Sequence, residues 1–317
     1  MEATEKVRQN IMENIYDLAI LGAGPAGICA AIYATRAKLN TIWLDKKFVQ
    51  GGQIVDTYEV DNYPGLPGIT GLDLGEAMAG HAKKLGMKPQ REPVRSIEAE
   101  QGIKVIRTKK NEYRARAVII ACGATHRHLG IPGEEELSGM GVSYCATCDA
   151  AFFQDRTVVV VGGGNVAVED AILLSRTCKK VYLVHRRDEL RAEKILQECL
   201  FACKNVELIW DSIPLSIEGT DKVEALKIQN KKTQEESFIE TDGVFIAVGI
   251  VPGTEKFKDL VKLDEAGYIV AGEDGITSEP GIFAAGDIRT KNLRQVVTAV
   301  ADGANAVASA QRYLLDK

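Results

Sequence analysis

The strongest constraint on the fold of this chain is a glycine-rich turn between a short apolar strand and a helix. Residues 15–21 predict a buried strand, GAGPAG follows at 22–27, and the next dozen residues have helical spacing. Residues 41–45 predict a second strand. In such a unit, amides at the helix N-terminus hold a pyrophosphate and an acid about 20 residues later binds a ribose hydroxyl. The unit therefore predicts nucleotide binding by Gly22, Gly24, Pro25, Ala26, Gly27 and Asp45.

The same pattern recurs about 140 residues later in the chain. Residues 156–162 are a Val-rich run typical of parallel sheets, GGGNVA follows at 162–167, and residues 180–187 predict the next strand. A glycine turn without a ligand is the alternative interpretation of either unit, but strand, helix and second strand all favour a nucleotide. A length of 317 residues also suits two domains. The second turn assigns Gly164, Asn165, Val166 and Ala167 to nucleotide binding.

Basic residues stand where the second unit would carry an acid if it bound NAD. His185, Arg186 and Arg187 end the predicted strand, and Arg191 follows one helical turn later. An acid there would repel a 2′-phosphate, whereas arginines bind one through charge-assisted hydrogen bonds. A solvated basic patch is the alternative. The pattern favours NADPH in the second unit, so we expect the first unit to hold a different nucleotide.

Two cysteines stand just before the second unit. Cys145 and Cys148 are separated by two residues, a spacing that lets them close and reopen a small disulfide ring, and Asp149 could carry a proton to or from the nearer sulfur. Half of a zinc site and a buried structural pair are the alternatives. Cys199 and Cys203 are the other close pair. We interpret those two as small apolar core residues, together with Cys29, Cys122 and Cys178, and we predict no metal site.

The C-terminal part of the chain has no strand partner of its own nearby. Residues 280–287 predict a strand that ends at Gly286 and Asp287, and a long helical pattern begins near Arg294, Gln295 and Val296. The helix N-terminus would place positive potential on whatever it faces, although an ordinary capped helix explains the pattern equally well.

We expect this segment to complete the first sheet, which makes the second domain an insertion. The predicted fold is α/β with two Rossmann-like dinucleotide-binding domains, the second inserted into the first. The predicted domains are residues 1–123 with 250–317, and residues 124–249.

Composition excludes several other classes of protein. The net charge of −5 does not suit a general binder of nucleic acid or of anionic membranes. No run of 18 apolar residues is present, and the first residues lack the apolar core of a signal peptide. Seven cysteines are too few, and odd in number, for a secreted disulfide scaffold. These features predict a cytoplasmic protein that binds neither membrane nor nucleic acid.

Six segments together resemble a known family of flavoproteins. GAGPAG at 22–27, GGQI at 51–54, CATCD at 145–149, GGGNVAVED at 162–170, HRRDELRA at 185–192, and FAAGD with LRQVVTA at 283–299 are similar in order and spacing to the low-molecular-weight thioredoxin reductases. Cys122, Ala150 and a polar extension of about ten residues at the start of the chain depart from the pattern. The resemblance covers nearly the whole chain.

The resemblance implies a homodimer with FAD in the outer domain and NADPH in the inserted one. It implies that Gly22, Gly24, Gly27, Gly52, Gln53, Asn62, Asp287 and Gln295 serve FAD, and that Gly164, Arg186, Arg187 and Arg191 serve NADPH. Electrons would pass from NADPH through FAD and the Cys145–Cys148 disulfide to thioredoxin. The nicotinamide and the cysteines share one domain and both need the flavin, so we expect a hinge near residues 122–127 and 249–254.

Other functions stay open on the sequence alone. A peroxiredoxin or a glutaredoxin-like protein could replace thioredoxin as the partner. Ferredoxin could replace NADPH as the electron donor, although the three arginines argue against this. A nonenzymatic NADP-sensing or zinc-binding module is the alternative from a different class, and it would be colourless.

Overall fold

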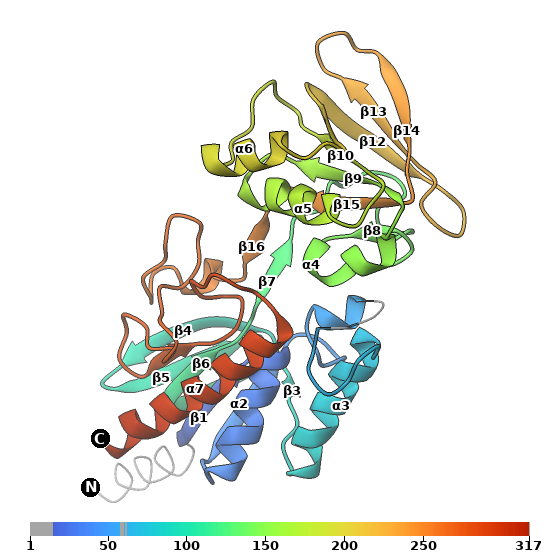
Figure 1. Ribbon diagram of the computed structural model, residues 1–317. Helices are drawn as coiled ribbons and strands as arrows, with labels where there is room; N and C mark the ends of the chain where they lie inside the picture. Colours follow the sequence, from blue (N-terminus) through green and yellow to red (C-terminus); the bar gives the residue numbers. More distant parts are fainter. Residues whose placement is uncertain (1–14, 58–59, 61, 317) are drawn as a thin grey trace, which may run out of the picture. The chain divides into compact units, whose positions relative to one another are not determined.

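The computed structural model describes residues 15–57, 60 and 62–316, which form two compact units (Figure 1). The polar extension at the start of the chain lies outside these residues. One unit comprises the chain up to Thr125 and from Val251 onward, and the other runs from His126 to Ile250. The predicted domain limits differ from these by one or two residues. That each unit is a separate cofactor-binding domain stays a prediction here.

The first unit contains a seven-stranded sheet with mostly parallel strands. Its order is β3-β2-β1-β6-β5-β4, and β17 pairs with the part of β6 that β5 leaves free. Thus the C-terminal segment completes the first sheet, as predicted. The elements are β1 (Ile15–Leu21), α2 (Pro25–Arg36), β2 (Thr41–Asp45), η1 (Ile54–Asp56), α3 (Gly71–Lys84), β3 (Gln90–Arg91), β4 (Val94–Glu100), β5 (Ile103–Thr108), β6 (Glu112–Ile120), η3 (Glu255–Phe257), β17 (Ile282–Ala284) and α7 (Val296–Leu315).

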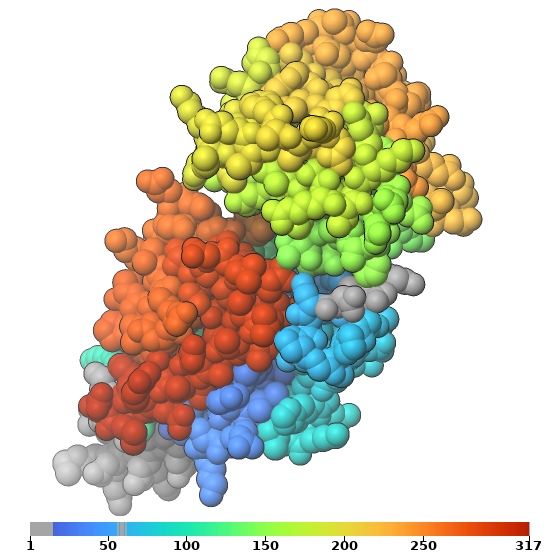
Figure 2. Space-filling model, viewed as in Figure 1, coloured from blue at the N-terminus to red at the C-terminus, as the bar shows by residue number. Residues whose placement is uncertain are grey.

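Residues 18–21 of the central strand β1 are buried. Successive side chains of a strand point to opposite faces, so both faces of β1 are covered there. Leu18 and Ile20 pack against the alanine-rich helices α2 and α7, whereas Ala19 and Leu21 face a separate apolar cluster that includes Phe257. The residues of α7, in red, and those of α2, in blue, lie side by side (Figure 2). The N-terminus of α2 is thereby fixed at the carboxyl edge of the sheet.

The second unit contains a five-stranded parallel sheet of order β11-β10-β9-β15-β8 and a three-stranded antiparallel sheet, β12-β13-β14. Helices α5 and α6 cover one face of the parallel sheet. The elements are β8 (Val142–Ser143), α4 (Ala146–Asp149), η2 (Ala150–Phe153), β9 (Thr157–Gly162), α5 (Asn165–Ser175), β10 (Lys180–Val184), α6 (Lys194–Phe201), β11 (Val206–Ile209), β12 (Ser212–Glu218), β13 (Ala225–Asn230), β14 (Glu236–Glu240) and β15 (Gly243–Ala247). The chain passes between the units in β7 (Ala124–His126) and β16 (Ile250–Pro252), which pair with each other.

Candidate functional site

The first glycine turn is built so that only glycine fits at two of its positions. A Cβ atom on Gly22, whose φ is +109°, would lie 2.3 Å from the carbonyl oxygen of Ala121, and one on Gly27 would lie 1.9 Å from the carbonyl oxygen of Gly22. Gly24 caps α2 in an extended conformation, and Pro25 opens the helix. Because these glycines have no side chains, the backbone of the turn is bare at the N-terminus of α2. Backbone N–H groups at a helix N-terminus can bind an anion.

Two further predicted segments meet this turn, and two more predicted residues contact each other. A Cβ atom on Gly52 would lie 3.0 Å from Cα of Gly24, and one on Gly286 would lie 3.0 Å from Cβ of Ala26. The side-chain amide of Asn62 donates a hydrogen bond of 3.0 Å to Oε1 of Gln295. Gln53 caps the short helix η1. The structure therefore brings together residues that are more than 230 positions apart in the sequence.

Asp45 and Val296 stand at the ends of elements beside the first turn. Asp45 ends β2 directly beside the end of β1, and its carboxylate accepts a hydrogen bond of 3.0 Å from the backbone N–H of Lys47. Val296 opens α7 and packs against the apolar cluster of Ile54, Val60 and Leu74.

Buried polar atoms without a partner lie at the C-terminal part of this site. Among the described residues, neither Oδ1 of Asp287 nor Nε of Arg294 has a hydrogen-bond partner, although both atoms are buried. Burial raises the pKa of Asp287, while Lys291 and Arg294 act to lower it. The Arg294 guanidinium lies 4.0 Å above the ring of Tyr268. An unpartnered buried polar group is costly unless a ligand satisfies it, so these atoms fit a polar ligand such as a flavin nucleotide.

The second glycine turn encloses a histidine. A Cβ atom on Gly163 would lie 2.2 Å from Nδ1 of His185. The carbonyl oxygen of Gly163 accepts a hydrogen bond of 2.8 Å from the backbone N–H of Arg191. Ala167 is fully buried beneath Gly162, where a larger side chain would not fit. Gly164 caps α5, and a Cβ atom there would meet nothing within 4 Å. The open space at Gly164 suits a ligand that approaches the backbone closely.

The remaining predicted residues of the second unit differ in exposure and in hydrogen bonding. Asn165 exchanges hydrogen bonds with Glu193, accepting one of 2.9 Å and donating one of 3.2 Å, so its side chain is already engaged. Val166 is exposed beside it. Arg186, Arg187 and Arg191 are also exposed, and no carboxylate within the described residues pairs with their guanidinium groups. Nε2 of His185 is buried and has no hydrogen-bond partner among the described residues, and burial lowers the pKa of this imidazole. Unpaired guanidinium groups beside a free turn fit a phosphorylated ligand.

Cys145 and Cys148 form a disulfide bond at the N-terminus of α4. The backbone N–H of Cys148 donates a hydrogen bond of 3.2 Å to Sγ of Cys145. Ser143 joins the pair to Asp149: its hydroxyl donates a hydrogen bond of 2.6 Å to the Asp149 carboxylate and accepts one of 3.1 Å from the backbone N–H of Cys145. Burial raises the pKa of Asp149, so this carboxyl group holds a proton at higher pH than usual.

The residue before the disulfide belongs to a polar cluster that the sequence interpretation missed. The Tyr144 hydroxyl donates a hydrogen bond of 2.7 Å to the buried carboxylate of Glu134 and lies 2.9 Å from Nδ1 of His128. His126 stacks on the Tyr144 ring at 5.3 Å between centroids. Glu134 also accepts backbone N–H bonds from Leu129 and Gly130. The three carboxylates in the run Glu134–Glu136 gave no sign of which one would be buried.

The prediction that the other five cysteines lie in the core is only partly correct. Cys29 and Cys178 are buried, whereas Cys122 and Cys199 are exposed and Cys203 is half-buried. Cys199 faces outward because it lies on the solvent side of α6, next to exposed Phe201. In the described part of the chain, no three His, Cys, Asp or Glu side chains are grouped to hold a metal ion. None of the helices described there combines the length and apolar character that spanning a membrane requires.

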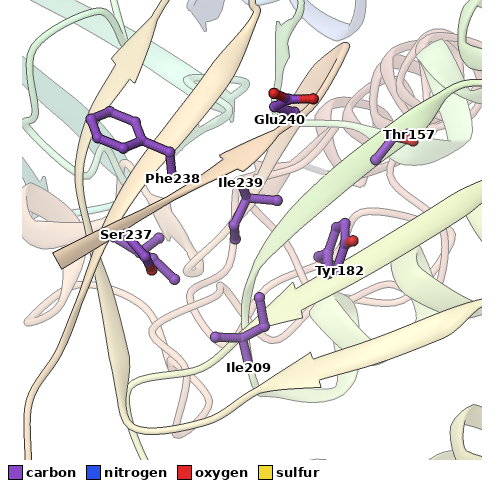
Figure 3. Close-up of a pocket in the computed structure, with 8 residues that line it drawn as sticks. Thr157, Tyr182, Ile209, Ser237, Phe238, Ile239 and Glu240 are labelled. Atoms are coloured by element: carbon purple, nitrogen blue, oxygen red, sulfur yellow. The ribbon is translucent and has the colours of Figure 1, made fainter. Parts of the chain in front are cut away.

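A hollow of about 500 Å³ lies elsewhere in the second unit, between its parallel and antiparallel sheets (Figure 3). Tyr182 and Ile209 line it from the parallel sheet, and Phe238 and Glu240 line it from β14. None of its lining residues is one of the predicted site residues. The hollow is therefore separate from the candidate site.

Comparisons with known proteins agree on one family. A family model described as pyridine nucleotide-disulphide oxidoreductase matches residues 16–303. The thioredoxin reductase of Listeria innocua is 49% identical over 95% of this chain and 95% of its own length. That of Bacillus subtilis is 46% identical over 95% of this chain and 96% of its own.

Solved structures give the same result. The thioredoxin reductase of Streptococcus pyogenes is 45% identical, with a TM-score of 0.92 over 96% of this chain and 99% of that one. A ferredoxin-flavin thioredoxin reductase from Clostridium acetobutylicum is more distant, at 30% identity and a TM-score of 0.51 over 95% of this chain and 99% of that one. The fold predicted from the sequence, α/β with one Rossmann-like domain inserted into another, is confirmed. The chain belongs to the pyridine nucleotide-disulphide oxidoreductase family and, within it, to the thioredoxin reductases.

Proposed function

We propose that this protein transfers electrons from NADPH, through FAD and the Cys145–Cys148 pair, to oxidised thioredoxin. The observation that carries the proposal is the disulfide at the N-terminus of α4, with Asp149 beside it, in the same compact unit as a dinucleotide-type glycine turn. The family implies a flavin and a pyridine nucleotide. That these are FAD and NADPH is the finer proposal, and it depends on the residues at the two turns.

FAD would be held by the first unit. The glycine turn at Gly22–Gly27, with Gly52 packed against it, would bind the diphosphate, and Asp45 would bind a ribose hydroxyl. The unpartnered oxygen of Asp287 and the linked pair of Asn62 and Gln295 supply polar groups for the rest of the molecule. A bound flavin supplies a two-electron carrier between a nicotinamide and a disulfide.

NADPH would be held by the second unit. Gly164 leaves the backbone open to a diphosphate, and Arg186, Arg187 and Arg191 present guanidinium groups without carboxylate partners. Three unpaired positive charges favour the 2′-phosphate that distinguishes NADPH from NADH. They also favour NADPH over ferredoxin as the electron donor.

The two cysteines would carry the final exchange. Reduction of the Cys145–Cys148 disulfide takes two electrons and two protons and leaves two thiol groups. One thiolate attacks the disulfide of thioredoxin, forming a mixed disulfide and releasing the first thioredoxin thiolate. The other cysteine attacks the mixed disulfide, which releases the second thiolate and closes Cys145–Cys148 again. Asp149, whose pKa burial raises, would donate and accept the proton at the nearer sulfur.

The proposal also covers the assembly and the compartment. We expect a homodimer. We also expect it to work in the cytoplasm, a reducing compartment in which thioredoxin is used continually. Sedimentation of the purified protein at micromolar concentration tests the dimer directly.

The test of the proposed function is turnover with defined donors and acceptors. The purified protein, loaded with FAD, is mixed with NADPH and either thioredoxin, a glutaredoxin or a peroxiredoxin, and NADPH oxidation is followed. We expect rapid turnover with thioredoxin and little with the others. A second series replaces NADPH with reduced ferredoxin. Faster turnover with a different acceptor or with ferredoxin would contradict the proposal, and a colourless protein that takes up no flavin would exclude it.

A further inference from the structure

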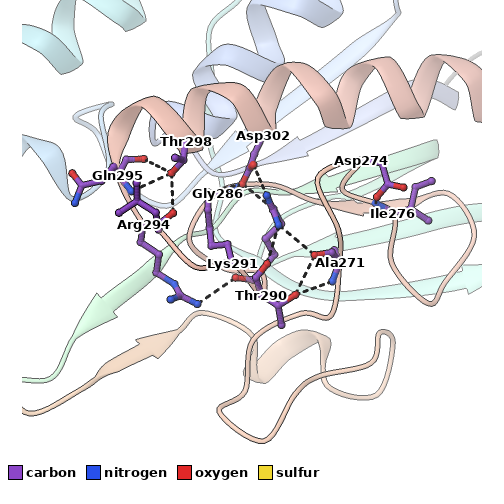
Figure 4. A network of polar contacts seen from close by, with 12 residues as sticks. Ala271, Asp274, Ile276, Gly286, Thr290, Lys291, Arg294, Gln295, Thr298 and Asp302 are labelled. Atoms are coloured by element: carbon purple, nitrogen blue, oxygen red, sulfur yellow. Dashed lines mark hydrogen bonds and ion pairs between the residues drawn. The ribbon is translucent and has the colours of Figure 1, made fainter. Parts of the chain in front are cut away.

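Asp302 is a charged residue buried in the middle of the apolar helix α7. It is 4% exposed, and its two carboxylate oxygens accept four hydrogen bonds. The donors are the backbone N–H of Gly286 at 2.9 Å, Nε and Nη2 of Arg289 at 2.9 and 2.6 Å, and Nζ of Lys291 at 2.8 Å. Figure 4 shows Asp302 pointing from the helix toward the loop that carries these donors.

The four bonds fold one loop around a single carboxylate. All three donor residues lie between positions 286 and 291, in the loop that follows β17. Nη1 of Arg289 donates hydrogen bonds to the carbonyl oxygens of Ala271 and Thr290, so Arg289 is engaged on every side. Since hydrogen bonds to charged groups are the stronger class, Asp302 contributes strongly to this loop's conformation.

The loop holds two residues of the proposed flavin site. Gly286 donates directly to Asp302, and Asp287 follows it with a buried carboxylate oxygen that has no partner in the described chain. Helix α7 is itself fixed against α2, because a Cβ atom on Gly303 would lie 2.2 Å from the carbonyl oxygen of Ala26. Asp302 thus connects the first glycine turn to the position of Asp287.

Charge gives Asp302 a second effect. Arg289 and Lys291 are buried cations that share this one carboxylate, so the group of three has a net charge of about +1. Lys291 and Asp302 act on the neighbouring Asp287 with opposite signs: Lys291 lowers its pKa and Asp302 raises it. The charges of Lys291 and Asp302 therefore act on Asp287, a residue of the proposed flavin site.

We propose that Asp302 is a positioning residue of the flavin site, which holds the Gly286–Asp287 turn in place and balances the two cations beside it. The inference rests on the proposed binding of FAD to the first unit. It assigns to Asp302 a role in flavin affinity and in the midpoint potential of the bound flavin, without contact with the reacting atoms.

The first test compares Asp302→Asn with the wild type and with Asp274→Asn, which changes the same side chain at an exposed position of the same unit. FAD dissociation is measured by flavin fluorescence, and the midpoint potential by dye-coupled titration. Asp302→Asn should weaken FAD binding about tenfold or more, because loss of a charged acceptor leaves buried donors unsatisfied. The potential should rise, since a more positive site stabilises reduced flavin. Asp274→Asn should change neither quantity.

The second variant separates a charge effect from a merely structural one. Lys291→Gln keeps the bonds of Asp302 to Arg289 and Gly286 but removes a cation, so the potential should fall. It also carries the test if Asp302→Asn does not fold. Unchanged FAD affinity in Asp302→Asn, or potentials that shift in the same direction in both variants, would overturn the inference. If the wild-type protein binds no FAD, the proposed function fails instead, so the two failures are distinguishable.

Discussion

The preference for NADPH over NADH should depend on two exposed arginines. Arg186 and Arg187 follow β10 and have no carboxylate partner in the described chain, so replacing both with alanine removes ligand contacts without breaking an ion pair. We expect the double variant Arg186→Ala, Arg187→Ala to keep its fold. Its melting temperature should lie within about 1–2 °C of the wild type, as for surface substitutions in general.

The size of the effect follows from the exposure of the arginines. A hydrogen bond between charged groups contributes about 1.5–3 kcal/mol, but solvent competes at an exposed site, so about 1–1.5 kcal/mol for each arginine is reasonable. The sum for two arginines is about 2–3 kcal/mol. Since every 1.4 kcal/mol is a factor of ten, kcat/KM for NADPH should fall roughly 30- to 150-fold. The change should appear mainly in KM, because the 2′-phosphate lies far from the transferred hydride.

The assay measures initial rates with NADPH and with NADH over a range of concentrations at fixed ionic strength. The matched control is Arg176→Ala. Arg176 is exposed and caps the C-terminal end of α5, whereas Gly164 caps its N-terminal end. The control should keep the wild-type preference, and the double variant should lose it while NADH kinetics stay nearly unchanged. Equal losses for both nucleotides would refute the reasoning, as would a wild-type enzyme without preference for NADPH.

Three other predictions concern the second unit and its connections. Gly163→Ala should destabilise the protein by about 1–3 kcal/mol, because its Cβ would lie 2.2 Å from the His185 ring. Gly164→Ala should lower the melting temperature less, because a Cβ there meets nothing within 4 Å and only the helix cap is weakened; equal melting temperatures would contradict this. Asp149→Asn should slow thioredoxin turnover about 100-fold and spare flavin reduction by NADPH. Since the pKa of Asp149 is raised, its protonated fraction falls as pH rises through that pKa, so wild-type turnover should decline on that side and the variant should lack this limb. A cross-link between the two units should block either flavin reduction by NADPH or disulfide reduction by the flavin, and spare the other. Full rates in both half-reactions would disprove the hinge.

Much of the fold could be predicted from local pattern. The strands at Ile15–Leu21 and Thr41–Asp45 have the predicted limits, because mainly apolar runs at a sheet centre leave few alternatives. β10 was predicted to reach residue 187 but ends at Val184, where its pairing with β11 ends at Ile209. The antiparallel sheet of β12–β14 was not predicted. Its strands mix exposed and buried positions, and neither a glycine motif nor a long apolar run marks them.

The candidate site was predictable only where residues stand in motifs. The glycine turns, the arginines and the cysteine pair follow from spacing, since the chemistry requires those residue types in a short segment. Asp302 and Glu134 lie outside any motif and act through partners that folding brings near. A carboxylate within the apolar pattern of the last helix was the one available signal for Asp302. Burial decides the state of such groups, and burial depends on long-range packing.

The most direct test of the central claim is flavin reduction and thioredoxin turnover in the single variants Cys145→Ser and Cys148→Ser. Both variants are prepared with FAD, reduced anaerobically with NADPH in a stopped-flow spectrometer, and then mixed with oxidised thioredoxin. The electron relay predicts that NADPH bleaches the flavin at close to the wild-type rate in each variant, while steady-state thioredoxin reduction is lost. Wild-type thioredoxin turnover in either variant would contradict the account.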